Sequence, residues 1–211
     1  MVIFDAMKSI FLFVMIATNA FSQNGNRHSI NLGVARTALY SSQLFYELDC
    51  IEGCYPTKET GGYFFDFNYL FAKNIGKNFF LPIGIGLNQK GFREKGLMSP
   101  GSNDLIPYSV SFKEIFISTY IGLSYDFLQK KKFRLNADEF LNPELGLGYP
   151  DAFALSNRTQ LSCRFHSSHK LSFQVTTFFE FALTDYSDED PLIPQSKWKP
   201  YGIGTSIGLC W

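Results

Sequence analysis

Along most of the chain after residue 28, bulky apolar residues alternate with small or polar ones with a period of two. The final segment shows this most clearly, with one face made of Tyr201, Ile203, Thr205, Ile207, Leu209 and Trp211 and the other of Gly202, Gly204, Ser206, Gly208 and Cys210. Because successive side chains of a strand point to opposite faces, the pattern predicts strands with one apolar face. Eight strands are expected, at about 29–40, 62–72, 79–88, 115–127, 133–149, 158–166, 171–184 and 201–211.

Composition excludes several other classes of protein. Aromatic residues make up 17% of the 211 residues, and an aromatic-rich chain of this kind is not disordered. The formal net charge of +0 argues against a nucleic-acid binder that relies on a basic face. No apolar run of about 18 residues follows residue 23, which excludes a helical membrane protein. A membrane-spanning form of this chain would have to be a β-barrel, and eight strands is an allowed even number.

The N-terminus has the layout of a secretory signal peptide. After Met7 and Lys8 comes an apolar core from Ile10 to Ile16, and then the small residues Ala20 and Ser22. Cleavage is expected after Ser22, so that residues 1–22 are the signal peptide and 23–211 the exported barrel. The signal starts better at Met7 than at Met1, which leaves the site of translation initiation open.

The predicted connections alternate between short and long. Residues 73–78, 129–132 and 167–170 form tight turns, whereas the stretches near 41–61, 89–113, 150–157 and 185–200 are longer. With eight strands, both termini lie at the short-turn end. This is the arrangement of outer-membrane barrels, which have short periplasmic turns and longer extracellular loops.

Volume decides which face points inward. An eight-stranded barrel has an interior just wide enough for its side chains, so the bulky face is expected outside, against lipid. The small face also carries ionisable residues that are expected to pair as a polar plug of the lumen: Asp66, Asp126, Arg134, Asp138, Glu144, Arg164 and Glu180. By the same argument Gly122 faces the lumen beside Ser124 and Asp126, and replacing it by Ser should cost little.

The register of the fifth strand is ambiguous from sequence. If Phe133, Leu135 and Ala137 face lipid, then Glu139 follows them unless the register shifts. Pro143 favours a bulge at this point, because proline removes a ladder hydrogen bond.

Four segments carry a resemblance to a known family: "NAFSQ", "GGYFFDFNYLFAKNIGKNFFLPIGIGLNQKGF", "FRLNADEFLNPELGLGY" and "YGIGTSIGLCW". Together they span nearly the whole mature chain and resemble the small outer-membrane β-barrels that include the OmpX-like and PorT-like porin-family proteins. The resemblance implies an eight-stranded antiparallel up-and-down transmembrane barrel in the outer membrane of a Gram-negative cell. It also implies that Ile207, Leu209 and Trp211 form a C-terminal signal for the barrel-assembly machinery. It implies little about a substrate, because this fold hosts many functions.

Cys50 and Cys54 lie close together in the first long loop. In an oxidising compartment they are candidates for a local disulfide, the alternative being two free thiols. No further soft ligands lie near them in the sequence, so no zinc site is predicted, and no catalytic residue or cofactor is predicted elsewhere.

The expected role is structural or based on surface interactions rather than catalytic, with outer-membrane lipid as surroundings and the long loops as contact surface for a protein or ligand. One alternative is an outer-membrane lipid hydrolase similar to lipid A deacylases. His166 and Ser168 form a His-x-Ser string, but at a short turn, away from the outer leaflet. The other alternative is a soluble, secreted lipocalin-like binder, whose strands alternate in the same way.

Overall fold

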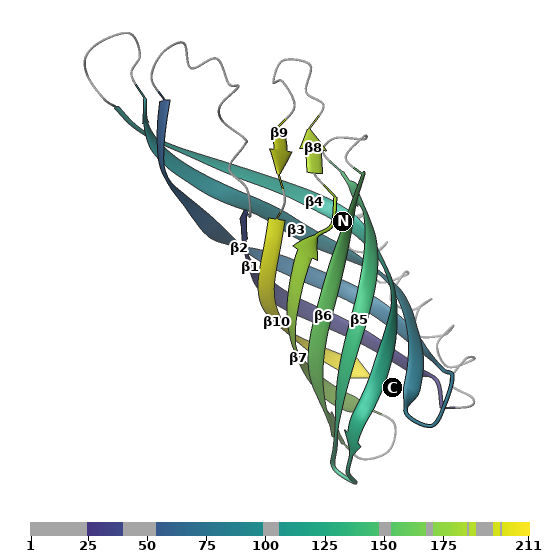
Figure 1. The fold of residues 1–211 in the computed structure, drawn as a ribbon. Helices are drawn as coiled ribbons and strands as arrows, with labels where there is room; N and C mark the ends of the chain where they lie inside the picture. The colour runs from purple at the N-terminus through teal and green to yellow at the C-terminus, as the bar shows by residue number, and fades with distance from the viewer. Residues whose placement is uncertain are drawn as a thin grey trace, which may run out of the picture.

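Eight long strands form one closed antiparallel barrel in the computed structural model of the chain, and the prediction of an eight-stranded antiparallel barrel is confirmed (Figure 1). The structure describes residues 25–39, 54–98, 106–147, 153–167, 171–184, 186–188, 196–198 and 200–211. The barrel strands are β1 (Arg27–Leu39), β2 (Cys54–Asn74), β3 (Phe79–Met98), β4 (Ile106–Gln129), β5 (Phe133–Gly146), β6 (Phe153–His166), β7 (Ser172–Ala182) and β10 (Pro200–Cys210). Strands β8 (Tyr186–Asp188) and β9 (Ser196–Trp198) form a separate two-stranded sheet in the last long connection.

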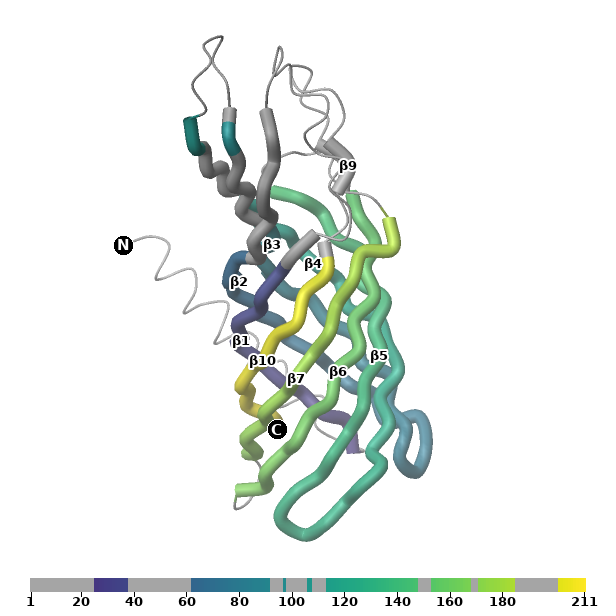
Figure 2. Tube along the Cα trace, turned by 60° about the vertical axis from the view of Figure 1, so that its left-hand side comes forward, coloured from purple at the N-terminus to yellow at the C-terminus, as the bar shows by residue number. Residues whose placement is uncertain are grey.

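The barrel closes between its first and last strands, which are antiparallel neighbours. Starting at Thr37 and passing from pair to pair through all eight strands leads back to β1 at Arg27, ten residues along the strand. With this stagger, eight strands tilt by about 40° from the barrel axis. The tilt is visible in Figure 2, where the strands cross the barrel obliquely.

Four strands are longer than the sequence predicts by five residues or more, among them β6, which begins at Phe153 inside the expected loop 150–157. The segment 89–113, expected as a loop, instead continues β3 to Met98 and begins β4 at Ile106, and β2 starts at Cys54 inside the expected loop 41–61. Figure 1 shows β2, β3 and β4 continuing past the barrel as a narrow sheet. The two-residue period on which the strand predictions rest does not extend clearly into these segments.

No bulge interrupts β5 at Pro143, and the prediction of one is wrong. β5 pairs with β6 without a break from Phe133 to Leu145. The one shift in its other ladder lies near the turn, between Asp126 and Leu128 of β4. Pro143 is tolerated within the ladder, and Glu139 keeps the outward orientation that the unbroken period gives it.

The interior holds large side chains opposite glycines. The buried large apolar residues include Phe64, Leu70, Phe80, Phe116, Tyr120, Phe140 and Phe178. A Cβ atom on Gly204 would lie 2.3 Å from the ring of Phe178, and one on Gly86 would lie 2.8 Å from the ring of Tyr120. The inner glycines therefore leave the space that these rings occupy. The inner face is thus not made only of the small and polar residues that the sequence pattern predicts.

The glycines of the inner face differ in how closely other atoms approach them. A Cβ atom at Gly122 would lie 2.3 Å from the backbone oxygen of Glu139, whereas at Gly202 its nearest neighbours would be the methyl group of Thr37 at 3.2 Å and the backbone oxygen of Arg36 at 3.7 Å. The sequence-based expectation that a hydroxyl is easily accommodated at Gly122 is therefore wrong, because the backbone of β5 occupies the position.

We predict that Gly122→Ser lowers the free energy of unfolding by about 1 to 3 kcal/mol, the usual cost of overpacking. Gly202→Ser, the same change on the same inner face, should cost well under about 1 kcal/mol, since a methyl group can shift. Urea-induced unfolding of both variants measures the difference. Equal stabilities would contradict the close approach of β5 to Gly122.

Candidate functional site

The lumen holds three clusters of charged side chains that follow one another along the barrel, with Glu180 shared by the upper and middle clusters. In the upper cluster, the Nζ atom of Lys90 on β3 lies 2.5 Å from a carboxylate oxygen of Glu144 and 2.5 Å from one of Glu180. The other oxygen of Glu144 accepts hydrogen bonds from Ser118 (2.9 Å) and Asn88 (3.2 Å). Each charge in this cluster therefore has an oppositely charged partner, which buried charges require.

The middle cluster is built around Arg158 on β6, which is 1% exposed. Its guanidinium donates two hydrogen bonds to Asp66 on β2, of 2.8 and 3.0 Å, and one of 3.2 Å to the hydroxyl of Tyr120. It also lies 3.6 Å from Glu180 and 3.6 Å from the centre of the Phe178 ring. Two parallel hydrogen bonds and a stacked ring fix a guanidinium firmly. This cluster joins β2 to β6 across the barrel.

The lower cluster lies at the short-turn end. Arg27 on β1 forms two hydrogen bonds with Asp126 on β4, and its guanidinium lies 3.4 Å from the centre of the Phe80 ring. Gln129 donates a further hydrogen bond to Asp126. Arg134 lies 3.9 Å from Asp126 and keeps 34% of its side chain exposed, so it borders the opening of the barrel.

Uncharged polar groups surround the remaining two ionisable side chains of the lumen. Asp138 accepts hydrogen bonds from Asn136 and from Gln160, the latter of 2.7 Å. Arg164 donates to Gln174, which also accepts a hydrogen bond from the thiol of Cys210. A cavity of about 20 Å³ lies beside these groups, enough for about one water molecule.

The residues proposed from sequence as the polar network mostly lie together. Six of the seven are buried in the lumen, and Arg134 is half-buried at its lower opening. Sequence reasoning missed three cations: Arg27, Lys90 and Arg158. Arg158 shares the inner face with Arg164 by the two-residue period, so its signal was present. Arg27 and Lys90 lie two residues outside the expected limits of their strands, so the two-residue period of those segments did not include them.

With these three included, the basic side chains of the lumen are Arg27, Lys90, Arg134, Arg158 and Arg164. The acidic ones are Asp66, Asp126, Asp138, Glu144 and Glu180, and Glu114 is half-buried on the same inner face of β4. Charges of both signs that pair with one another can be removed from water at lower cost than unpaired ones.

The other predicted residues have different surroundings. Cys50 lies outside the described residues, and Cys54 is the first residue of β2, its side chain not described. The signal peptide also lies outside the described residues. Ile207 and Leu209 point outward from β10, and Trp211 exchanges two backbone hydrogen bonds with His28 and stacks on its ring at 5.8 Å. The last residue therefore contacts the first strand.

The histidine considered for hydrolase chemistry lies at the short-turn end. The Nδ1 atom of His166 lies 3.0 Å from the hydroxyl of Ser172, and Ser168 is outside the described residues. No group of three or more His, Cys, Asp or Glu side chains that could hold a metal ion occurs in the described part of the chain. Within the same residues, none of the elements is a helix of the length and apolarity needed to cross a membrane.

Comparisons with known proteins give structural similarities only. No family model and no curated protein matches the chain. Among solved structures, it is similar to the Neisserial surface protein A (TM-score 0.44, 11% identity, 88% of this chain and 96% of that one). It is also similar to the outer membrane protein OprG from Pseudomonas aeruginosa (0.46, 10%, 88% and 96%) and to the outer membrane protease OmpT from Escherichia coli (0.43, 12%, 90% and 97%). At this identity, the similarities identify no residue of this chain as functional.

We predict that Arg158→Met lowers the free energy of unfolding by about 3 to 5 kcal/mol, because Asp66 is left buried without its partner. Arg134→Met, which removes a half-exposed arginine at the opening, should cost less than about 1 kcal/mol. Chemical unfolding of both variants measures the difference.

The double variant Arg158→Met with Asp66→Leu tests the reason for this loss. Removing both charges should restore part of the stability lost in the single variant. A double variant less stable than Arg158→Met would contradict the assignment of the loss to an unpaired carboxylate.

Proposed function

We propose that this protein is a transmembrane barrel of the Gram-negative outer membrane, with a lumen filled by side chains and a structural or surface-interaction role. The observation that supports it is the inverted polarity of the barrel. Every barrel strand exposes large apolar side chains on its outer face, among them Leu32, Phe67, Ile85, Ile121, Leu141, Leu161, Val175 and Ile207. The same strands bury charged side chains inside, among them Asp66, Glu144 and Arg158. In water, such an outer face would be a far larger apolar patch than soluble monomers expose.

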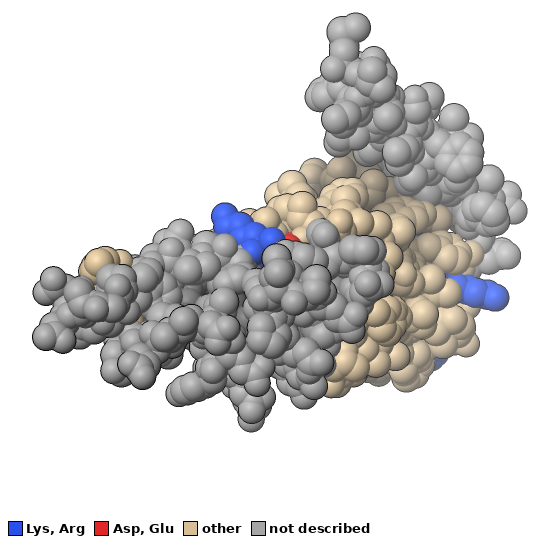
Figure 3. All heavy atoms as spheres, turned by 90° about the horizontal axis from the view of Figure 1, so that it is seen from above, with Lys and Arg blue, Asp and Glu red and all other residues tan. Residues whose placement is uncertain are grey.

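The polarity also distinguishes the proposal from a soluble lipocalin-like binder. A lipocalin keeps apolar side chains inside to line a ligand cavity and polar ones outside. Here Ile207 is 68% exposed, whereas Glu144 is 1% exposed. Figure 3 shows few charged side chains on the part of the barrel wall visible from above, as expected for a wall that contacts the hydrocarbon of a bilayer.

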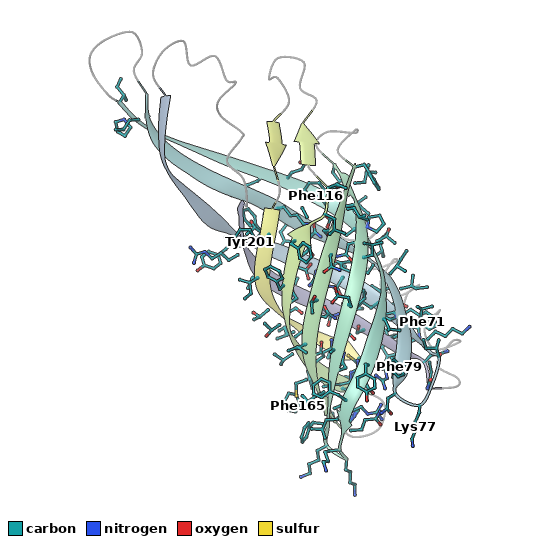
Figure 4. The ribbon with its side chains drawn as sticks, viewed as in Figure 1. Phe71, Lys77, Phe79, Phe116, Phe165 and Tyr201 are labelled. Atoms are coloured by element: carbon teal, nitrogen blue, oxygen red, sulfur yellow. The ribbon has the colours of Figure 1, made fainter. Side chains whose placement is uncertain are left out.

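The ends of the barrel support an orientation. The connections at one end cover only 75–78, 130–132 and 167–171, and Lys77 lies at the tip of the first of them (Figure 4). The longer connections and the extension of β2, β3 and β4 lie at the opposite end (Figure 1). Outer-membrane barrels place short turns in the periplasm. The extension and the long connections would therefore face outward from the cell, as the surface available to a protein or ligand.

The positions of the polar groups support the proposal of a non-catalytic role. The charged groups of the lumen are paired with one another, and the cavity among them has room for about one water molecule. The His166 and Ser172 pair lies at the short-turn end, whereas a lipid hydrolase of the outer leaflet needs its histidine at the other. We also propose that Trp211, with Ile207 and Leu209, is read by the barrel-assembly machinery, since the three end the strand that closes the barrel.

Insertion of a charge tests the orientation of the wall. Ile121→Arg should cost about 2 to 4 kcal/mol in lipid vesicles, because Ile121 is 48% exposed and lies in the middle of the apolar belt. Ile106→Arg, at the start of β4 in the extension, should cost less than about 1 kcal/mol because it lies beyond the hydrocarbon. Unfolding in vesicles measures both. A wild-type protein that folds to a monodisperse monomer in buffer without lipid or detergent would overturn the membrane assignment.

The filled lumen predicts that the purified protein gives no large, steady conductance in planar lipid bilayers. The charged clusters occupy the path that ions would take, as the small volume of the remaining cavity indicates. An open-state conductance of porin size in the unmodified protein would contradict the filled lumen. The variant Lys90→Ala serves as the comparison, because it removes a long side chain from the upper cluster of the lumen and leaves the outer wall unchanged.

A further inference from the structure

The carboxyl group of Glu139 lies on the outer, apolar face of the barrel wall. Glu139 is near the middle of β5, and its side chain is exposed on the outer face. On that face Leu123 pairs with it from β4, Thr159 and Asn157 lie beside it on β6, and Leu141 and Leu161 are 44% and 57% exposed. If the barrel spans a membrane, as proposed above, this carboxyl group lies in hydrocarbon, where such groups are costly and rarely without a role.

Its local hydrogen bonding is incomplete. The hydroxyl of Thr159, which pairs with Glu139 from β6, donates a hydrogen bond of 2.6 Å to one of its oxygens. The second oxygen has no hydrogen-bond partner among the described residues. Water would supply one in solution, but a lipid chain cannot. A second protein surface can.

A second copy of the chain can supply the hydrogen bonds that Glu139 and Thr159 lack. In hydrocarbon the neutral form of a carboxyl group costs far less than the charged form, and it has one O–H to donate as well as a carbonyl oxygen that accepts. A threonine hydroxyl donates one hydrogen bond and accepts another. The donors and acceptors of Glu139 and Thr159 therefore match those of an identical pair.

Symmetry brings the two pairs together. Glu139 and Thr159 are opposite each other on neighbouring strands, and each is near the middle of its strand. Strands are about 4.8 Å apart and tilt by about 40°, so the two side chains differ in depth by only about 3 Å. A two-fold axis along the membrane normal keeps each residue at its own depth and can place β5 of one barrel against β6 of the other, as a self-complementary interface requires.

We propose that the protein forms a two-fold symmetric dimer in the membrane through this face, which we define as Glu139, Thr159 and the flanking Leu123, Leu141 and Leu161. Each Glu139 donates its O–H to Thr159 of the other copy, and each Thr159 donates to Glu139 of its own chain. Four hydrogen bonds form a closed ring, with the leucines packed around it. The proposal rests on the membrane location proposed above.

Sedimentation equilibrium in density-matched detergent micelles, over a range of protein-to-detergent ratios, measures the association. The wild type should be in monomer–dimer equilibrium. Glu139→Leu should weaken dimerisation on the order of tenfold or more, and Thr159→Val should weaken it in the same direction. Glu139→Gln, whose amide keeps a donor and an acceptor, should stay within about threefold of the wild type. Thr205→Val, the same change at an exposed threonine in the middle of β10, should have no effect.

Insertion into lipid vesicles and the heat-dependent gel shift of each variant are measured first. A wild type that does not insert would refute the membrane location, whereas one that inserts but stays monomeric at every ratio would refute only the dimer. Equal association of Glu139→Leu and the wild type, or a closed assembly larger than a dimer, would also overturn the proposed face. If Glu139→Leu fails to fold, the comparison of Thr159→Val with Thr205→Val decides the question.

Discussion

The narrow interior of an eight-stranded barrel is the constraint on which the rest of this structure depends. A stagger of ten residues around eight strands fixes the width of the lumen, and that width admits side chains but no open passage. Several of the large side chains that point inward lie against a glycine, as Phe178 lies against Gly204. Most bulky residues must therefore point outward, and the exposed apolar wall follows from the closure of the sheet.

The buried charges follow from the same closure. In a strand with a period of two, the apolar residues share one face and the polar residues share the other. Because the apolar face forms the outer wall here, the polar and charged residues point into the lumen. Ion pairs such as Arg158 with Asp66 and Lys90 with Glu144 link strands that are distant in the sequence. Such buried pairs add little net stability compared with apolar packing, but breaking one leaves an uncompensated charge. The network therefore favours one arrangement of the strands over others that would separate its charges.

Glu139 shows what happens when the pattern is not followed. A single carboxyl group on the outer face, with Thr159 as its described partner, has no consequence in water and a large one in hydrocarbon. Its position in the middle of two neighbouring strands is what makes a symmetric contact between copies geometrically simple. If the barrel spans a membrane, as proposed, its outer wall would at this point recognise a particular surface.

The sequence by itself determined the number of strands in the barrel, their antiparallel order and the face of each that points inward. These depend on local alternation and on turn lengths, which are properties of neighbouring residues. It also identified six buried members of the lumen network, because ionisable residues on the inward face of a strand must lie inside the closed barrel. Only the tertiary structure decided which charges pair, since Asp66 and Arg158 are 92 residues apart and meet through closure alone. The same holds for the strand extensions, for the unbroken ladder at Pro143 and for the tight contact at Gly122. Each depends on the neighbouring strand and its exact register, which no local pattern encodes.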